Sequence, residues 1–556
     1  MDAPAPHRPP VVAVPAARLA HLGPLVAVGA AAILAARAAG DVQGAPLVED
    51  EAVSGLIGAR PLGELLHTVM VERHGAPLHY VLTHVAFWID RSPEALRWLS
   101  MACAILTVLV VYDLGRRLAG PLAGSVASLA VATSTLLGVY ASFGRIYATF
   151  ALVGALAADL LVRALDRRTV RASLAAAAAC ALLPAAHPYG AMPLAGAALV
   201  GLIAWRGRPL LPGLAVAAVG ACGIPFAVFA LGLFDRFAVG RAESRPLASP
   251  EEAWWMVGRL FHATAGGRTV LAAIFLAIGV AGLVLAGRRR PLLAVYAVLG
   301  LALPPLLLMS LRTESAPELS PRHLIYALPL LAAFVGVAVA AAARRLPLAA
   351  GAAVVALAVA GLVAAPSGGV ADPRDRPLLI LGGGDRETAV GAWPQLVRVR
   401  DWLDAVVGRH DVLVPHAAPY LAAIGATGDA LTLPTVEPQL VREAVRHARL
   451  PIPQVVVVAP VASARVDVAA LAALLPSGSE AQLLGPWLAV RIPGPFETRG
   501  DALVAAGRAL DAMARTAVLP PGGPYAPSAL AYYLESNRFA VCEAAVLLGR
   551  RCASPG

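Results

Sequence analysis

Long apolar runs occupy most of the first two thirds of this 556-residue chain, and they constrain its fold more than any other feature. About 20 apolar residues rising 1.5 Å each cross the roughly 30 Å hydrocarbon core of a bilayer as an α-helix. The runs predict about eleven spans, at 22–38, 96–113, 121–140, 145–165, 172–186, 188–205, 209–234, 269–287, 291–311, 322–342 and 346–365. We therefore expect a polytopic α-helical membrane protein.

The composition agrees with a lipid environment and argues against nucleic acid as a partner. Hydrophobic residues make up 58% of the chain and charged residues 14%, whereas about a quarter of a soluble domain is charged. Every basic residue is Arg, which indicates coding bias, so the net charge of +10 is weak evidence for an anionic partner. No basic stripe interleaved with aromatic residues is present, and no nucleic-acid binding is predicted.

The placement of Arg predicts the orientation of the chain in the cell (inner or plasma) membrane. Arginines recur in alternate loops: Arg116 and Arg117, Arg163 to Arg171, Arg206 and Arg208, Arg288 to Arg290, and Arg344 and Arg345. The positive-inside rule assigns these loops to the cytoplasm. Residues 1–20 then form a disordered cytoplasmic tail, residues 21–368 the transmembrane domain, and residues 371–556 an extracytoplasmic domain.

The first outer loop, residues 39–95, carries two predicted helices that do not cross the membrane. Residues 52–71 have apolar side chains at helical spacing, which predicts one amphipathic helix on the membrane surface. Residues 76–89 are apolar but too short to span, so we expect an embedded or interfacial helix there. Counting this segment as a span would invert every later loop and place the Arg clusters outside.

The C-terminal part, residues 371–556, has the charge distribution of a soluble domain and alternates between two kinds of pattern. Strands are predicted at 377–381, 411–415, 454–460 and 487–493, and helices at 394–407, 438–449, 467–475 and 500–517. This alternation favours a small α/β domain. Cys542 and Cys552 both lie in it and would have an oxidising environment if it is outside the cytoplasm, but the sequence leaves their pairing open.

Polar residues in the transmembrane part gather at its predicted outer side. Five clusters do so: Glu49-Asp50-Glu51, His74 to Tyr80, Tyr140 to Tyr147, His187 with Tyr189, and Arg312 to His323 with Glu314, Glu318 and Arg322. Each cluster alone also fits a structural role, such as a helix cap or an Arg that reaches up to water. Polar groups at membrane depth are costly, so their shared placement favours a functional site.

Five segments in order carry a resemblance to a known superfamily. They are EDEAVSGLIGARPLGELLHTVMVERHGAPLHYVLTH, ALRWLSMACAILTVLVVYDLGRRLAG, YASFGRIYATFAL, AHPYGAMPLAG and SPRHLIYALPLL. Together they resemble the membrane glycosyltransferases of the GT-C superfamily, above all glycosyltransferase family 39, with its protein O-mannosyltransferases and lipid A aminoarabinose transferases. The resemblance covers roughly residues 20 to 345, and it does not extend to the C-terminal domain.

The resemblance implies an inverting hexosyl- or pentosyltransferase that moves a sugar from a polyprenyl-phosphate carrier to an acceptor on the outer face. Asp50 matches the acidic residue that acts as the general base, and its neighbour Glu51 is the second choice. A buried carboxylate has the chemistry for this role, because burial raises its pKa toward the working range. Whether the acceptor is a glycan, a lipid or a protein stays open.

The carrier phosphate requires cations and hydrogen-bond donors near the headgroups. Arg145 and Arg322 are the candidate phosphate ligands, since Arg binds phosphate with two parallel hydrogen bonds. Tyr147 and His323 are candidate donors, His187 is a further candidate, and His74 matches the first position of an HPPLYY-like motif. No cofactor is predicted, and a divalent metal is not supported, because only Asp50 and Glu51 form an obvious acidic pair.

Two other classes of function remain open from the sequence. A transporter or flippase of lipid-linked substrates would also have many spans and a few buried charges, but such proteins often contain repeated halves, and none is visible here. A catalytically inactive GT-C-like scaffold is the other alternative. Phe143 stands where many relatives have an acid, so any role of that acid is lost or is supplied by Glu314 or Glu318.

Overall fold

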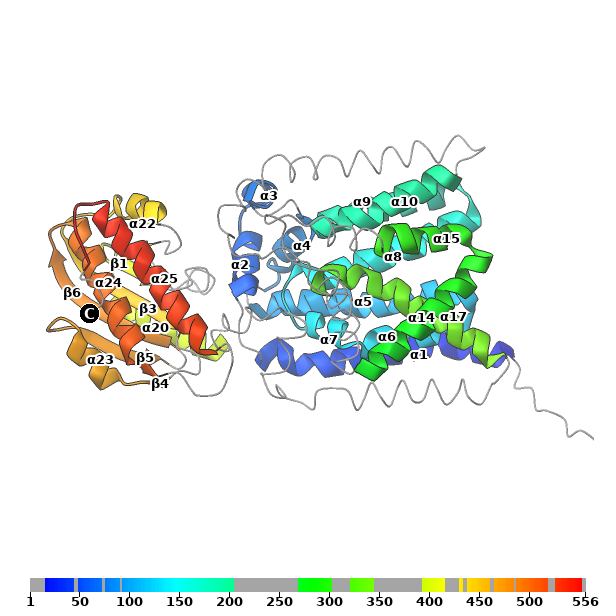
Figure 1. The fold of residues 1–556 in the computed structure, drawn as a ribbon, viewed down its shortest axis with the longest axis horizontal. Helices are drawn as coiled ribbons and strands as arrows, with labels where there is room; N and C mark the ends of the chain where they lie inside the picture. Colours follow the sequence, from blue (N-terminus) through cyan, green and yellow to red (C-terminus); the bar gives the residue numbers. More distant parts are fainter. Residues whose placement is uncertain are drawn as a thin grey trace, which may run out of the picture.

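A computed structural model gives the fold of the chain as a bundle of apolar helices followed by an α/β unit (Figure 1). The residues that the structure describes are 16–44, 49–72, 76–90, 93–204, 269–302, 321–344, 393–415, 430–433, 438–460, 465–484, 487–518 and 526–552. Short segments between these ranges, and two long ones at 205–268 and 345–392, lie outside the description.

Five helices in the described part of the chain are long and apolar enough to cross a membrane. They are α1 (Ala16–Gly44), α5 (Pro93–Ala119), α8 (Ile146–Arg167), α14 (Thr269–Arg289), and the run from η3 (Pro321–Ala327) into α17 (Leu328–Ala343). The pair α6 (Pro121–Thr133) and α7 (Thr135–Ala141), bent by 63°, raises the number to six when it is counted as one span. The chain is a multi-pass membrane protein.

The remaining predicted spans are described in part or lie outside the description. Residues 170–204 form α9 (Val170–Ala186), η1 (Pro188–Gly190) and α10 (Ala191–Ala204), and residues 291–302 form α15 (Pro291–Tyr296) and the π-helix η2 (Ala297–Ala302). These helices are apolar but below the length of a full span. The runs at 209–234 and 346–365 are not described, so the total of eleven spans stays a prediction.

Small residues let the helices of the bundle approach closely. A Cβ atom added at Gly282 in α14 would overlap the carbonyl oxygen of Phe334 in α17. A Cβ atom at Gly336 in α17 would overlap the carbonyl oxygen of Ala123 in α6. Because lipid provides no hydrophobic driving force between helices, such close contacts supply packing energy that larger side chains would prevent.

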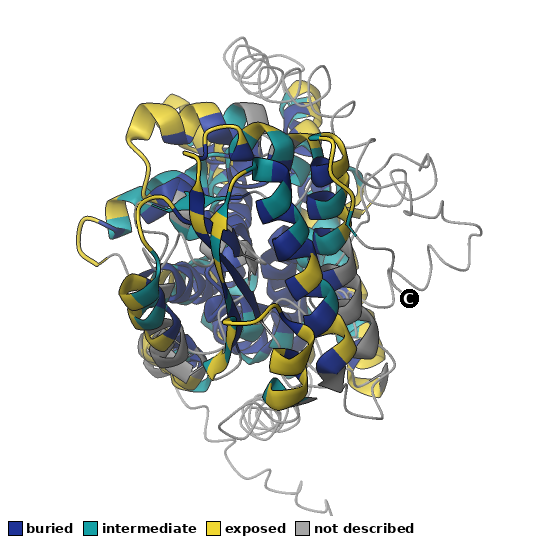
Figure 2. Ribbon diagram, turned by 90° about the vertical axis from the view of Figure 1, so that its left-hand side faces the viewer, coloured by how far each residue is buried: buried dark blue, intermediate teal, exposed yellow. Residues whose placement is uncertain are grey.

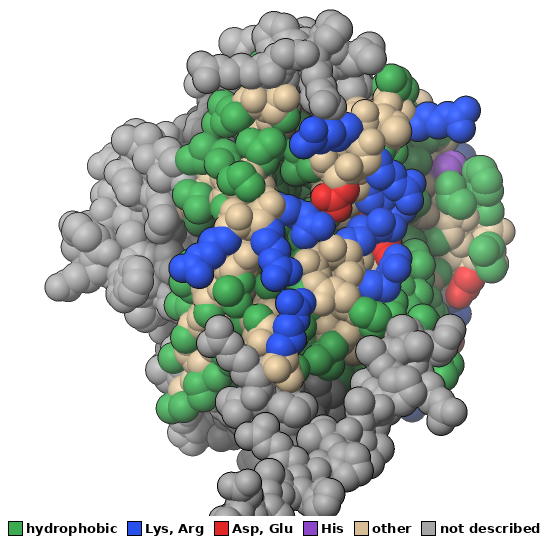
Figure 3. All heavy atoms as spheres, turned by 90° about the vertical axis from the view of Figure 1, so that its right-hand side faces the viewer, with side chains coloured by type: hydrophobic (Ala, Val, Ile, Leu, Met, Phe, Trp, Pro, Cys, Tyr) green, Lys and Arg blue, Asp and Glu red, His purple; other side chains and the backbone are tan. Residues whose placement is uncertain are grey.

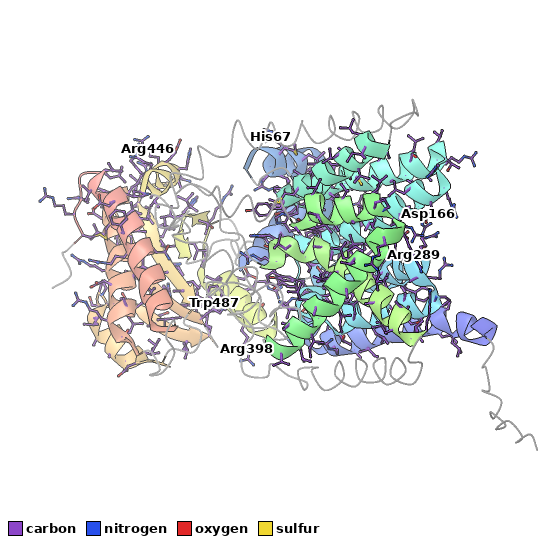
Figure 4. All side chains as sticks on the ribbon, turned by 45° about the vertical axis from the view of Figure 1, so that its right-hand side comes forward. His67, Asp166, Arg289, Arg398, Arg446 and Trp487 are labelled. Carbon is purple, nitrogen blue, oxygen red and sulfur yellow. A yellow bond between two sulfur atoms is a disulfide. The ribbon has the colours of Figure 1, made fainter. Side chains whose placement is uncertain are left out.

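Arginines and a few acids form a network at the end of the bundle that lies farthest from the α/β unit (Figure 3). Asp113 accepts hydrogen bonds from Arg116, Arg117 and Arg163, and Arg163 also pairs with the buried Asp159 at 2.7 Å. Asp166 pairs with Arg290 at 3.1 Å. Figure 4 shows Asp166 and Arg289 at this end. The Arg-rich loops of the described chain therefore share one end of the molecule.

The segment between α1 and α5 contains three short helices, α2 (Glu49–Gly58), α3 (Leu62–Glu72) and α4 (Leu78–Ala86). The prediction of one amphipathic helix over 52–71 is wrong, because the chain breaks after Gly58 and restarts beyond Pro61. Proline lacks an N–H, and it disfavours helical geometry at the preceding Arg60. The short helix expected within 76–89 is present as α4 and does not qualify as a span. All three helices lie at the bundle end nearest the α/β unit (Figure 1).

The α/β unit is built on a five-stranded mixed sheet with the order β2-β1-β3-β6-β5. The strands are β1 (Val412–Pro415), β2 (Leu431–Thr432), β3 (Ile452–Pro460), β5 (Glu480–Leu484) and β6 (Trp487–Phe496). The first three strands of this order are parallel, and β6 and β5 are each antiparallel to their neighbour. A separate antiparallel pair joins β4 (Arg465–Val466) to β7 (Ala517–Val518).

Helices cover both faces of this sheet. They are α20 (Trp393–Val406), α22 (Pro438–Val445), α23 (Val468–Leu474), α24 (Arg499–Thr516) and α25 (Ala526–Val546). The helices α24 and α25 share a buried core with one face, and α20 packs on the other against the fully buried Trp487. Figure 2 shows the buried residues along the sheet and the inner sides of its helices, and Figure 4 shows Trp487 on the side toward the bundle.

Most elements predicted for the C-terminal part are present. The strands at 411–415, 454–460 and 487–493 and the four predicted helices are confirmed, whereas the strand at 377–381 lies outside the described residues. The long helix α25 and the edge strands β2 and β5 were not predicted. Cys542 in α25 forms a disulfide with Cys552, which ties the last helix to the segment that follows it.

Candidate active site

The first turn of α2 is held by a buried ion pair. Glu51 is 1% exposed, and Arg97 of α5 binds its carboxylate with two hydrogen bonds, from Nε to Oε1 at 2.8 Å and from Nη2 to Oε2 at 2.7 Å. The backbone N–H of Gly144 also donates to Oε1 at 2.7 Å. Arg97 donates further to the carbonyl oxygen of Val42 at 3.1 Å. Glu51 therefore joins three separate segments of the chain at one point.

Gly144 is required for this junction. A Cβ atom at this position would lie 2.8 Å from Cβ of Leu96 and 3.2 Å from Oε1 of Glu51. The sequence reasoning did not single out Arg97. Its signal was available, because Arg97 is a charged residue within the apolar run predicted to span at 96–113, where such residues need a partner.

The second residue of α2 is Asp50, the predicted base. Its backbone lies in the helix, but its side chain is outside the described residues, as are His74, Glu314 and Glu318. Position 50 precedes Ser54 by one helical turn, so the two positions share a helix face. Ser54 is fully buried, and its hydroxyl accepts a hydrogen bond from Nη1 of Arg145 at 3.3 Å.

Arg145 ends the turn between α7 and α8 and is the N-cap residue of α8, with extended backbone (φ −135°, ψ 170°). Its guanidinium thus reaches α2, whereas Tyr147, two residues later, faces a different element. The guanidinium carbon of Arg322, from η3, lies 5.6 Å from the centre of the Tyr147 ring, which is a cation–π contact. Residues from the third and fifth sequence clusters therefore meet in space.

Aromatic and imidazole rings surround Tyr147. The ring of His187 lies 5.9 Å from it and that of His323 lies 6.2 Å from it, centre to centre, and the two imidazoles are 5.3 Å apart. Tyr189 packs 5.3 Å from His187 and 5.0 Å from His323. The cluster is completed by the rings of Tyr140, Phe150 and Tyr326. We call this group, with Arg322, the ring cluster.

His187 lies in the turn between α9 and η1. His187 ends α9 in an extended conformation, and its Nδ1 accepts a hydrogen bond from the backbone N–H of Tyr189 at 3.2 Å. An Nδ1 atom that accepts cannot carry a proton in the same bond, so the neutral ring carries its hydrogen on Nε2. The buried ring of His187 stacks on Phe150, with centres 4.9 Å apart.

His79 of α4 is a second residue that sequence reasoning did not single out within its cluster. Its ring is fully buried, and Nδ1 lies 3.1 Å from Oγ1 of Thr149 in α8. Burial, and next the positive charge of Arg145, lower the pKa of His79 from 6.5 to about 3, while the Gly144 backbone acts in the opposite direction. His79 is therefore neutral at physiological pH.

The arrangement suits an anionic group. The guanidinium of Arg145 contacts Ser54 of α2. Two residues later, Tyr147 of α8 lies against the guanidinium of Arg322 and near the imidazoles of His187 and His323. Guanidinium groups bind phosphate oxygens with strong, directional hydrogen bonds. Within the described residues, no group of three or more His, Cys, Asp or Glu side chains is placed to hold a metal ion.

Comparisons with known proteins agree with this architecture. The sequence model of the family described as dolichyl-phosphate-mannose-protein mannosyltransferase matches residues 74–229. No curated protein sequence matches the chain. The crystal structure of ArnT from Cupriavidus metallidurans bound to undecaprenyl phosphate is similar, with a TM-score of 0.51, 16% identity, and coverage of 84% of this chain and 97% of ArnT.

Two further solved structures are similar to the chain. Apo ArnT from the same organism has a TM-score of 0.51 at 14% identity over 84% of this chain and 97% of its own. The oligosaccharyltransferase of Archaeoglobus fulgidus in its apo form has a TM-score of 0.44 at 14% identity over 78% of this chain and 69% of its own.

The chain therefore shares the fold of ArnT, a helical membrane domain followed by a further unit, and over residues 74–229 it matches the sequence model of a mannosyltransferase family.

Proposed function

We propose that this protein transfers a hexose or pentose from a polyprenyl-phosphate carrier to an acceptor on the outer face of the cell membrane. ArnT, which shares the fold along nearly its whole length, was solved with undecaprenyl phosphate bound. The observation that carries the proposal is that Arg145, at the start of α8, contacts α2, the helix that begins with the acidic run 49–51, while Tyr147, two residues later, lies against Arg322 and the two imidazoles of the ring cluster.

Arg145 and Arg322 are the proposed ligands of the carrier phosphate, with His323, His187 and Tyr147 as neighbouring polar groups. Arg322 packs on the Tyr147 ring, which supports its planar group without using its N–H donors. A phosphate that leaves the sugar gains charge on its bridging oxygen, and fixed guanidinium groups stabilise that charge most strongly where water is excluded. His74 is proposed to act beside them.

Asp50 is the proposed general base. Its neighbour Glu51 is a poor candidate, because both of its carboxylate oxygens already accept hydrogen bonds from Arg97 and one accepts a third from Gly144. We propose that Glu51 instead fixes the first turn of α2. Position 50 shares a helix face with Ser54, the hydroxyl that Arg145 contacts, and this supports a base close to the carrier phosphate.

The proposed reaction is a single displacement with inversion. Asp50 accepts the proton of the acceptor nucleophile as its oxygen or nitrogen forms a bond to the anomeric carbon. The bond between that carbon and the phosphate oxygen breaks, and the electron pair leaves with the polyprenyl phosphate. One proton moves to the carboxylate and no electron carrier is needed. Positioning of the two substrates and charge stabilisation supply most of the rate enhancement.

The proposed orientation has the Arg-rich end in the cytoplasm and the α/β unit outside. The described Arg loops gather at the bundle end opposite the α/β unit (Figure 3), as the positive-inside rule requires of cytoplasmic loops. The Cys542–Cys552 disulfide supports an oxidising compartment for the α/β unit, since such bonds are rare in the cytosol. The α2 to α4 loop, which faces that unit, then lies at the outer surface.

The decisive experiment separates binding from transfer. Carrier binding is measured by titrating undecaprenyl phosphate into the purified protein in nanodiscs. Sugar transfer is measured in native membranes, as the release of polyprenyl phosphate from labelled polyprenyl-phosphate hexoses and pentoses. We expect Asp50→Asn to abolish release while carrier affinity is kept, and Glu64→Gln, an exposed acid of α3, to change neither. Full turnover by Asp50→Asn would remove Asp50 as the base. Carrier translocation without sugar release by the wild type would favour a flippase.

A further inference from the structure

His79 lies at the start of a buried polar chain that links three helices. Its Nδ1 is 3.1 Å from Oγ1 of Thr149 in α8, and the same hydroxyl is 3.7 Å from Sγ of Cys103 in α5. All three side chains are buried. The chain connects the short helix α4, which is not a span, to two helices that are. It is a specific attachment point for α4 within the bundle.

Thr149 occupies the first turn of α8, which Arg145 caps. Thr149 lies one helical turn after Arg145. A hydrogen bond that fixes the Thr149 side chain therefore also restrains the turn from which the Arg145 side chain projects. The backbone of Gly144, the residue before Arg145, is held from the other side by Glu51. The N-terminal end of α8 is thus held by the carboxylate of Glu51 in α2 and by the imidazole of His79 in α4.

The charge state of His79 suits this place. Next to Arg145, an imidazolium would repel the guanidinium and compete with it for an anion, whereas a neutral ring keeps one donor and one acceptor for hydrogen bonds. Arg145 is the charged residue that acts on the pKa of His79, Tyr80 lies ring to ring at 6.1 Å, and Cys103 lies beyond Thr149. A neutral His79 therefore adds no positive charge beside Arg145.

We propose that His79 is a positioning residue for Arg145, which it holds in place against the carrier phosphate through Thr149 and the first turn of α8. The inference rests on the proposed function, since it concerns the site assigned to the carrier. His79 touches neither the sugar nor the reacting atoms in this proposal. It affects only the position of the Arg145 guanidinium group.

Two pairs of variants test the hydrogen bond itself. His79→Leu and Thr149→Val remove it, whereas His79→Asn, whose amide replaces the Nδ1 position, and Thr149→Ser retain it. The probe is undecaprenyl phosphate, titrated into the full-length protein in nanodiscs. We expect the first pair to weaken affinity on the order of tenfold, a size typical of coupled neighbours, and the second pair to stay within about twofold of the wild type.

A double-mutant cycle with Arg145→Ala distinguishes positioning from a general loss of stability. If His79 acts through Arg145, His79→Leu has little further effect on affinity in the Arg145→Ala background. Additive losses, or equal losses in His79→Leu and His79→Asn, would overturn the proposal. A variant that fails to fold is recognised by its elution in size-exclusion chromatography. If a His79 variant fails in this way, the comparison of Thr149→Val with Thr149→Ser tests the proposal, because each of them changes only one methyl or hydroxyl group.

The outcome also separates this inference from the proposed function. If the wild type does not bind undecaprenyl phosphate, the carrier site is wrong and with it everything that rests on it. If the wild type binds and His79→Leu binds equally well, the carrier site stands and only the role of His79 is rejected. In turnover, a positioning role predicts a higher KM for the carrier-linked sugar with a smaller change in kcat.

Discussion

Nη2 of Arg97 lies 2.7 Å from Oε2 of Glu51, and both side chains are at most 4% exposed. An ion pair so deeply buried is costly to break, because the remaining charge has no water to solvate it. We expect Arg97→Leu to lower the free energy of unfolding by about 3–5 kcal/mol. Reversible denaturation in mixed micelles measures the change.

The matched control for this pair is Arg515→Ala. Arg515 forms an ion pair with Asp511 at 2.9 Å, but its side chain is 48% exposed. A surface pair contributes less than about 1 kcal/mol, because water screens it. A loss at Arg97 no larger than the loss at Arg515 would contradict the view that Glu51 and Arg97 fix the first turn of α2.

A methyl group at position 144 provides a more local test. In Gly144→Ala, the new Cβ would meet Cβ of Leu96 at 2.8 Å, and neither atom can rotate away. The Gly144 N–H must then move from Glu51, so we expect loss of most sugar release. Gly63→Ala, where nothing lies within 4 Å of the added Cβ, should leave release unchanged, and equal effects of both variants would argue against the junction.

Tyr147 has two proposed contributions, a ring beneath Arg322 and a hydroxyl near the carrier. Tyr147→Leu removes both and Tyr147→Phe keeps the ring. Since a cation–π contact contributes about 0.5–2 kcal/mol, which is roughly a 2- to 30-fold change in affinity, Tyr147→Leu should bind undecaprenyl phosphate more weakly than Tyr147→Phe. Equal affinity of the two variants would leave the Arg322 contact without a role in binding.

Stability in acid should report the buried imidazole. His79 has a pKa of about 3 in the folded protein, against 6.5 for a solvated histidine, so between these limits the unfolded chain binds a proton that the folded chain does not. Stability then falls as the pH drops from about 6.5 toward 3, and His79 causes no pH dependence above 6.5. His79→Asn should show a shallower fall in melting temperature over this window, and parallel curves would contradict the burial of a neutral ring.

The disulfide makes a prediction about both stability and sidedness. Replacing Cys542 and Cys552 together by Ala should destabilise the α/β unit by about 2–4 kcal/mol, because the crosslink restricts the unfolded chain.

The orientation of the chain in the membrane can be tested by labelling. Arg409→Cys in the α/β unit should react with a membrane-impermeant maleimide in intact cells. Arg167→Cys, exposed at the other end, should react only after permeabilisation, and the reverse pattern would invert the topology.

The periodicity of the sequence was sufficient for much of the fold. Apolar length predicted α1, α5, α8, α14 and α17, and strand–helix alternation predicted the centre of the α/β sheet. Edge strands such as β2, only two residues long, have too little pattern to be found. Pro61, where the helix breaks, was visible in the sequence. The apolar residues before and after it keep the same helical spacing, however, and this suggested one continuous helix.

The site was harder to predict than the fold. Chemistry at the membrane surface indicated Arg145, Tyr147, His187, Arg322 and His323, and the structure brings Arg322 and the rings of the two histidines around Tyr147, with Arg145 at the adjacent helix end. The partners of Arg97 and His79 could not be predicted, because each lies distant in sequence. Glu51 pairs across 46 residues and His79 across 70, and no local pattern encodes such a pairing.

The 63° bend between α6 and α7 has one more effect on the membrane interior. Where a helix breaks, carbonyl oxygens lose their partners in the next turn, and lipid offers no replacement. Ser134 interrupts the helix, and the carbonyl oxygen of Ala132 accepts a hydrogen bond from Nη1 of Arg37 in α1 at 3.0 Å. This bond ties α1 to the break between α6 and α7, so a shift of one along its axis requires the other to follow.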